Sequence, residues 1–169
     1  MLRRAKTAAL LCGLLLGSWY GMQVVHEAGH VFAAWVTGGH VERVVLWPWT
    51  ISRTDVSPNP HPRVVVWGGP LLGIAIPLLA WAISTWCRWR WAHIARFFAG
   101  FCLVGNGLYL GIGSFEGIGD AGEILRLGVP RWGLWLFGGI ATPCGLALWH
   151  RQGRQFGLTQ READSHEAL

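Results

Sequence analysis

The sequence predicts an all-α integral membrane protein with about four transmembrane helices and a short β-hairpin loop after the first. Of its 169 residues, 52% are apolar, and they fall in long blocks instead of recurring with the period of a soluble helix or strand. Many of the twelve Trp residues stand at the ends of these blocks, where amphipathic rings favour the membrane–water interface. The lipid bilayer is therefore the first partner that the sequence implies.

Four apolar blocks are long enough to cross a hydrocarbon core of ~30 Å. They cover about residues 8–36, 64–86, 93–112 and 132–149. Pro77 lies inside the second block and is expected to kink it. Together the blocks define a membrane-embedded core over residues 1–150.

The two ends of the chain differ from the blocks. The basic start followed by apolar residues 10–16 resembles a signal peptide. The apolar character continues past signal-peptide length and no small-x-small cleavage site follows, so the segment is expected to stay as a membrane helix. Residues 151–169 are polar and are expected to form a loosely ordered tail.

The segment after the first block favours strands. Gly38 and Gly39 are typical of a helix end, and residues 41–47 and 50–54 are rich in β-branched and aromatic side chains. They are expected to pair as a hairpin around Pro48 and Trp49.

Charge and cysteine content exclude other classes of protein. The net charge of +5 comes from Arg residues between apolar blocks, which indicates membrane anchoring and no nucleic-acid partner. None of the cysteines forms a Cys-x-x-Cys pair, so neither a thiolate metal site nor a disulfide framework is expected. The four are Cys12, Cys87, Cys102 and Cys144.

The residues that carry chemistry are His26-Glu27-Ala28-Gly29-His30, inside the first block. Residues four apart lie on one face of a helix, so both imidazoles can reach a single ion. Glu27 beside them is suited to take a proton from metal-bound water. Ionisable groups are costly in an apolar block, and a metal ion would compensate that cost. The structural alternative is two neutral His and a protonated Glu, hydrogen-bonded within a helix bundle.

A catalytic zinc ion usually has three protein ligands and keeps one position for water. With four spans, the segment between the third and fourth returns to the membrane side of the His pair. The third ligand is expected there at Asp120, among glycines that permit close backbone approach, with Glu116 and Glu123 as competitors. The site would lie roughly 9–15 Å from the end of the first helix. His40 and His61 are expected to be loop residues without a metal role.

The motifs together resemble the site-2-protease-like intramembrane zinc metallopeptidases. The resemblance rests on His26-Glu27-Ala28-Gly29-His30, Gly68-Gly69-Pro70-Leu71 and Gly119-Asp120-Ala121-Gly122, in that order, and covers about residues 22–128. It implies Zn²⁺ bound by His26, His30 and Asp120, with Glu27 as the catalytic acid and base. It also implies that the hairpin holds substrate by strand addition, with Val44 and Val45 as the candidate contacts.

The chain departs from that family at two places. Gly119-Asp120-Ala121 stands where Leu-Asp-Gly is common, and Gly73 stands where Asn is frequent. Asn106 in the third block is the candidate for the polar substrate contact that this Asn would supply, although it lies farther before Asp120 than the family spacing.

The working hypothesis is a multi-pass membrane zinc metalloendopeptidase that cleaves membrane-associated polypeptides. One alternative is a non-catalytic zinc-binding membrane protein, a regulator or an inactive relative, which would have no need of Glu27. A small ion carrier is a third, although the second and fourth blocks offer few polar residues for a route across the membrane. Counting Lys and Arg places the N-terminus in the cytoplasm and the site near the outer face, whereas the resemblance implies the reverse. The sequence sets neither the substrate nor the oligomeric state.

Overall fold

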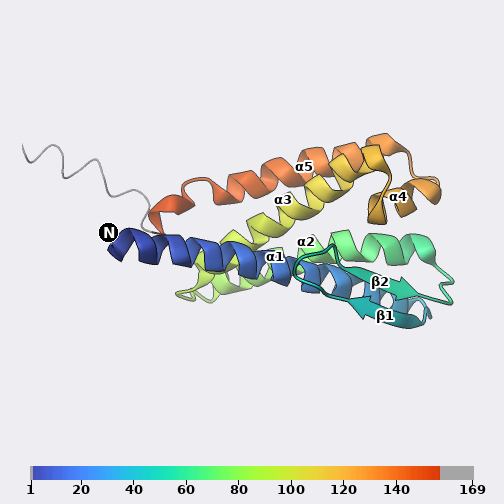
Figure 1. The fold of residues 1–169 in the computed structure, drawn as a ribbon, viewed down its shortest axis with the longest axis horizontal. Helices are drawn as coiled ribbons and strands as arrows, with labels where there is room; N and C mark the ends of the chain where they lie inside the picture. The colour runs from blue at the N-terminus through green and yellow to red at the C-terminus, as the bar shows by residue number, and fades with distance from the viewer. Residues whose placement is uncertain (1, 157–169) are drawn as a thin grey trace, which may run out of the picture.

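The structure, a computed structural model, describes residues 2–156, and most of them are helical. The helices are α1 (Leu2–Val36), α2 (Pro62–Trp86), α3 (Ala92–Glu116), α4 (Gly119–Arg126) and α5 (Arg131–Trp149), and a 3₁₀ turn, η1 (Gln152–Arg154), follows. Two short strands, β1 (Val41–Val45) and β2 (Arg53–Val56), lie between α1 and α2. Figure 1 shows the long helices running roughly side by side.

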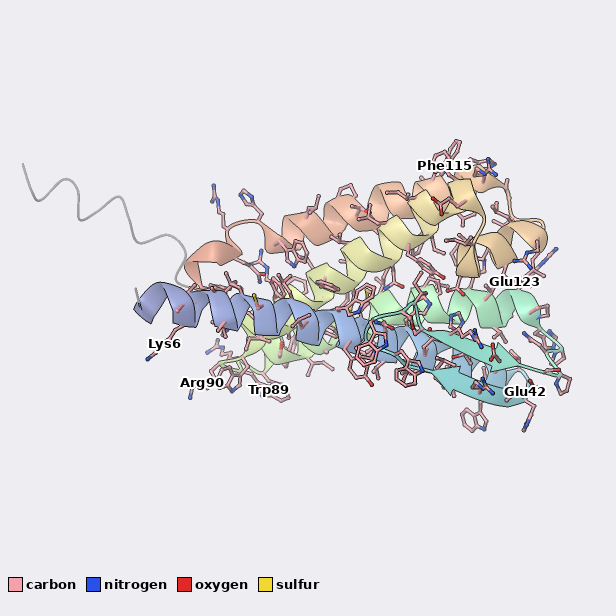
Figure 2. The ribbon with its side chains drawn as sticks, viewed as in Figure 1. Lys6, Glu42, Trp89, Arg90, Phe115 and Glu123 are labelled. Carbon is pink, nitrogen blue, oxygen red and sulfur yellow. The ribbon has the colours of Figure 1, made fainter. Side chains whose placement is uncertain are left out.

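The two ends of this bundle are different. The start of α1, the turn between α2 and α3, and the end of α5 gather at one end, and the hairpin and α4 lie toward the other (Figure 1). Figure 2 shows the basic residues Lys6 and Arg90 at the first end and the acidic residues Glu42 and Glu123 at the second. The hairpin and α4 therefore lie at one end of the bundle, where both can contribute to a site on the His-bearing part of α1.

Four helices, α1, α2, α3 and α5, are long and apolar enough to cross a membrane by length and composition. The prediction of a mainly helical chain with four such helices and one hairpin is confirmed. The predicted boundaries of the helices were too narrow, because α1 begins at Leu2 and α3 continues to Glu116. Backbone hydrogen bonds continue through polar residues at helix ends, where an apolar block has already stopped. Helix α2 continues without a break through Pro77, and the kink expected there stays a prediction.

The hairpin is present, but its strands are placed differently from the prediction. In the antiparallel pair, Val44 is opposite Thr54 and Val45 is opposite Arg53. Residues 46–52 form the loop, so the second strand starts later than expected and continues to Val56. A hydrogen bond of 2.7 Å from the Trp19 indole to the Pro48 carbonyl ties the loop to α1, an interaction that strand propensity does not encode.

The segment before the fourth long helix, where the sequence indicated no helix, forms α4. Gly117 and Gly119 have positive φ values of 65° and 55°, and they turn the chain out of α3 and into α4. Ala121 and Ile124 of α4 are fully buried, in a core that includes Leu110 and Leu134. This apolar contact fixes the first turn of α4, and with it Asp120, against the bundle.

Small residues bring α1 close to α2. A Cβ atom added at Gly68 would lie 2.7 Å from the Gly29 carbonyl oxygen and 2.6 Å from the Ala33 Cβ, so only glycine fits. The predicted polar tail begins as η1, and its residues 157–169 lie outside the described part of the chain.

Candidate metal centre

Three metal-binding groups converge at the hairpin end of the bundle. His26 and His30 lie one turn apart on α1, and Asp120 reaches them from α4. The Nε2 atoms of the two rings are 3.1 Å apart, and Asp120 Oδ2 lies 2.8 Å from the first and 3.2 Å from the second. A tetrahedral zinc ion with bonds of ~2.0–2.1 Å would separate its ligand atoms by ~3.3 Å. The triangle formed by the three atoms is therefore close in size to one face of a tetrahedral zinc site.

Hydrogen bonds on the other ring nitrogens set the tautomers. His26 Nδ1 lies 2.7 Å from the Asn106 Oδ1 atom, and the Asn106 Nδ2 donates to the Cys102 carbonyl at 2.9 Å, which fixes the orientation of that amide. His30 Nδ1 lies 2.8 Å from the Val65 carbonyl. A carbonyl oxygen only accepts, so each ring carries its proton on Nδ1 and donates it outward. In the neutral rings, both Nε2 atoms are left as acceptors that face the centre.

The converging atoms are therefore all acceptors. Two imidazole nitrogens and a carboxylate oxygen within about 3 Å repel one another unless a positive charge lies among them. Protonating both rings would place two cations side by side in a buried site, whereas one divalent ion satisfies all three atoms. Imidazole and carboxylate ligands suit zinc, so the residues present fit a zinc ion.

Asp120, the candidate third ligand, is held in place by its surroundings. Its backbone N–H donates to the Tyr109 hydroxyl at 3.1 Å, and the Tyr109 ring stands edge-on to His26 with centroids 5.9 Å apart. Burial by itself would raise the pKa of Asp120, but positive charge next to it, carried by protonated imidazoles at His26 and His30 or by a metal ion bound in their place, holds the pKa of this carboxyl below its usual range. Asp120 is therefore a carboxylate, the form that binds metal.

Glu27 lies beside the cluster and is fully buried at 2% exposure. Its Oε2 accepts a hydrogen bond of 2.6 Å from the Thr54 hydroxyl, which comes from β2. A carboxylate in such surroundings needs a partner because an unpaired buried charge is costly. The hairpin thus supplies the group that holds Glu27.

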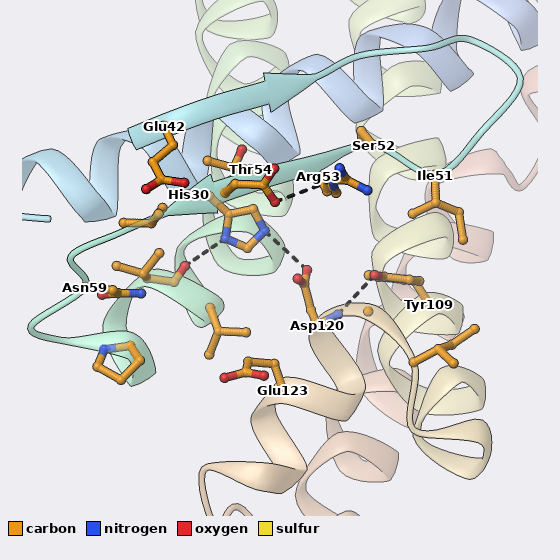
Figure 3. Close-up of a pocket in the computed structure, with 17 residues that line it drawn as sticks. His30, Glu42, Ile51, Ser52, Arg53, Thr54, Asn59, Tyr109, Asp120 and Glu123 are labelled. Carbon is orange, nitrogen blue, oxygen red and sulfur yellow. Dashed lines mark hydrogen bonds and ion pairs between the residues drawn. The ribbon is translucent and has the colours of Figure 1, made fainter. Parts of the chain in front are cut away.

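A cavity of about 590 Å³ opens beside His30 and Asp120. Figure 3 shows β2 crossing above it, with Arg53 and Thr54 on one side and Glu123 of α4 on the other. The expected substrate contacts Val44 and Val45 of β1 are not among its lining residues; β1 contributes Glu42, and all four residues of β2 line it. The strand that faces the cavity is β2.

The remaining predicted residues have clear places. Asn106 is fully buried and positions His26, and its predicted contact with substrate stays a prediction. Glu123 is partly exposed and pairs with Arg126 at 3.4 Å, outside the cluster. Glu116 is the exposed last residue of α3, and His40 and His61 lie exposed in loops.

Thr54, Tyr109 and the Val65 carbonyl are parts of the site that no sequence motif indicated. Each acts through a contact between residues far apart in the chain, and no local motif marks such a residue.

A scan against protein-family models, a search of curated proteins and a search of solved structures each found no match to this chain.

Proposed function

We propose that this protein is a multi-pass integral membrane protein. Large apolar side chains are exposed on all four long helices, among them Leu16, Leu79, Ile112 and Ile140. In water such surfaces would drive aggregation, whereas in lipid they are the expected exterior. Exposed Trp side chains at helix ends and loops, such as Trp49, Trp86 and Trp132, suit the interfacial zone.

We propose further that it is a zinc metalloendopeptidase of the site-2-protease-like kind. The observation that carries this proposal is the triangle of three acceptor atoms from His26, His30 and Asp120 with a buried glutamate, Glu27, next to it. Two imidazoles and one carboxylate leave one zinc position free for chemistry, as in catalytic zinc sites. A purely structural zinc site would be closed by a fourth protein ligand.

Each residue of the site would have its own role. His26, His30 and Asp120 would hold the ion, and Asn106 and the Val65 carbonyl orient the two rings through their Nδ1 protons. When bound, zinc would polarise the peptide carbonyl and lower the pKa of water. Glu27 takes the proton of the attacking water and passes it to the leaving amine, and Thr54 keeps its carboxylate in place until then.

The substrate would be an extended stretch of a membrane-associated polypeptide. The edge of β2 faces the cavity beside His30 and Asp120, so an added strand there would bring its peptide bonds to the centre. A helical segment would first have to unwind, because its carbonyl groups are already hydrogen-bonded.

The test of this function is Glu27→Gln in the purified, zinc-loaded protein. Its cleavage of a mixture of membrane polypeptides, followed by mass spectrometry, is expected to fall about 10²–10⁴-fold because the general base is lost. Zinc content should stay the same. Glu123→Gln, which changes an acid at the rim of the cavity beside His30 and Asp120, is the matched control and should cleave like wild type. Equal cleavage by the Glu27 variant would refute the proposed base.

The non-catalytic zinc-binding protein remains the second candidate, and one observation favours it. Glu27 is buried and its Oε2 is already bonded to Thr54, as in a residue that only joins the hairpin to α1. That protein would bind zinc and give no cleavage that depends on Glu27.

A further inference from the structure

A second, smaller cavity lies on the other side of His26 and Glu27, between α1 and α3. Its volume is about 170 Å³, close to that of a ~150 Å³ cavity that can bind benzene. Its apolar walls come from Trp19 and Met22 of α1 and from Ile51 of the hairpin loop. It therefore has room for a side chain of medium size next to the proposed base.

One wall of this cavity carries an unpartnered amide. Gln23 lines the cavity and is only 3% exposed, yet neither its Nε2 nor its Oε1 has a hydrogen-bond partner among the described residues. Residues 23 and 27 are four apart on α1, so Gln23 lies on the helix face of Glu27. Buried amides are rarely left unsatisfied, and one that faces a cavity is suited to bind a ligand.

The chemistry of the amide restricts the ligand. Gln23 offers one donor group and one acceptor, so its full partner must also both accept and donate. A neutral amide or hydroxyl does this, whereas a carboxylate only accepts and a lysine or arginine only donates. The carboxylate of Glu27 lines the same cavity and repels acidic groups.

We propose that this cavity is the specificity pocket of the peptidase and takes a neutral polar side chain, of about glutamine length, from a residue next to the bond that is cut. The apolar walls receive the methylene groups, and the Gln23 amide exchanges hydrogen bonds with the polar end. The inference rests on the proposed function, because the pocket borders the site through His26 and Glu27.

The test is the binding of peptide hydroxamates, whose hydroxamate group binds zinc, to the zinc-loaded protein. Two pairs of probes differ only in glutamine against the near-isosteric methionine, with the variable residue on the acyl side of the hydroxamate in one pair and on the amine side in the other. Wild type is expected to bind the glutamine member of one pair about tenfold more tightly, which corresponds to about 1.4 kcal/mol. Gln23→Leu should abolish that preference without lowering zinc content.

The control variant is Gln152→Leu, which makes the same change at a buried glutamine in η1, at the other end of the bundle. It should keep the preference for glutamine. Thermal unfolding separates a pocket residue from a structural one, because Gln23→Leu should leave the melting temperature unchanged or raise it.

Three other outcomes would overturn the inference, and each points to a different cause. Equal binding of both members of each pair, unchanged by Gln23→Leu, would refute the pocket and leave the zinc site intact. A lowered melting temperature with no change in preference would make Gln23 structural. A protein that holds no zinc and binds no hydroxamate would refute the proposed function, and the pocket with it.

Discussion

Helix α3 packs against α5 on one side and borders the candidate metal centre on another. The two sides use different kinds of residues. Toward α5, a Cβ atom at Gly145 would lie 2.7 Å from the Gly100 carbonyl oxygen, and one at Gly138 would lie 2.7 Å from that of Gly107. The neighbouring residue, Asn106, points the other way and accepts a hydrogen bond from His26.

This difference shows what each region needs. Small residues let two backbones approach until their atoms pack, and such an interface is complete with protein atoms alone. The candidate metal centre instead brings acceptors together, and the backbone contacts around it cannot neutralise them. The first region serves the stability of the bundle, and the second is an arrangement that the proposed divalent cation would make favourable. Variants that act on one region and spare the other would test this separation.

Among variants that separate the two regions, the largest effect is expected from Asn106→Leu, on zinc affinity. The substitution removes the acceptor that orients His26, and loss of such a partner typically lowers metal affinity about 10–100-fold. Competition with a chromophoric chelator measures the zinc Kd. Asn106→Asp keeps an oxygen for the Nδ1 proton and should restore most of the affinity. An unchanged Kd in the leucine variant would contradict the positioning role.

A smaller effect is expected from Thr54→Val, which removes the hydroxyl that donates to Glu27 and keeps the shape of the side chain. A hydrogen bond to a charged group of this kind is worth about a tenfold change in rate. Cleavage should fall by that factor while the zinc Kd stays the same. Thr54→Ser returns the hydroxyl and should recover the rate; a serine variant as slow as valine would point to a packing role for Thr54.

The smallest effect on the site is expected from Gly145→Leu. The new side chain would meet the Gly100 carbonyl oxygen and the Leu103 and Val104 side chains, and such overpacking costs about 1–3 kcal/mol. Thermal unfolding in detergent should show the loss of stability, and the zinc Kd of the folded protein should not move. Gly139→Leu makes the same change where no atom lies within 4 Å and should leave both quantities unchanged. Lost zinc binding in the Gly145 variant would show that the two regions are coupled.

Much of the fold follows from the sequence because long apolar blocks have few structural solutions. The four long helices and the hairpin were predicted, since a run of apolar residues and a run of β-branched residues each constrain the backbone locally. Helix α4 was not predicted, because it is short and the burial of Ala121 and Ile124 that stabilises it depends on other helices.

The candidate site also has a part that the sequence predicts and a part that it does not. His26, Glu27 and His30 are adjacent in sequence and could be recognised as a motif, and Asp120 could be inferred from the number of spans. The contact of Thr54 with Glu27 could not, because it depends on which face of the hairpin turns toward α1. Which hairpin residues line the cavity likewise depends on how the hairpin docks, and the sequence therefore did not reveal that Glu42 and the residues of β2 line it whereas Val44 and Val45 do not.

The central claim is that His26, His30 and Asp120 bind one zinc ion, and zinc-edge X-ray absorption of the purified protein tests it most directly. The account predicts one zinc per chain, with only nitrogen and oxygen ligands at ~2.0–2.1 Å and the outer-shell scattering of two imidazole rings. A sulfur ligand at ~2.3 Å, or a protein prepared with zinc that holds none, would contradict it.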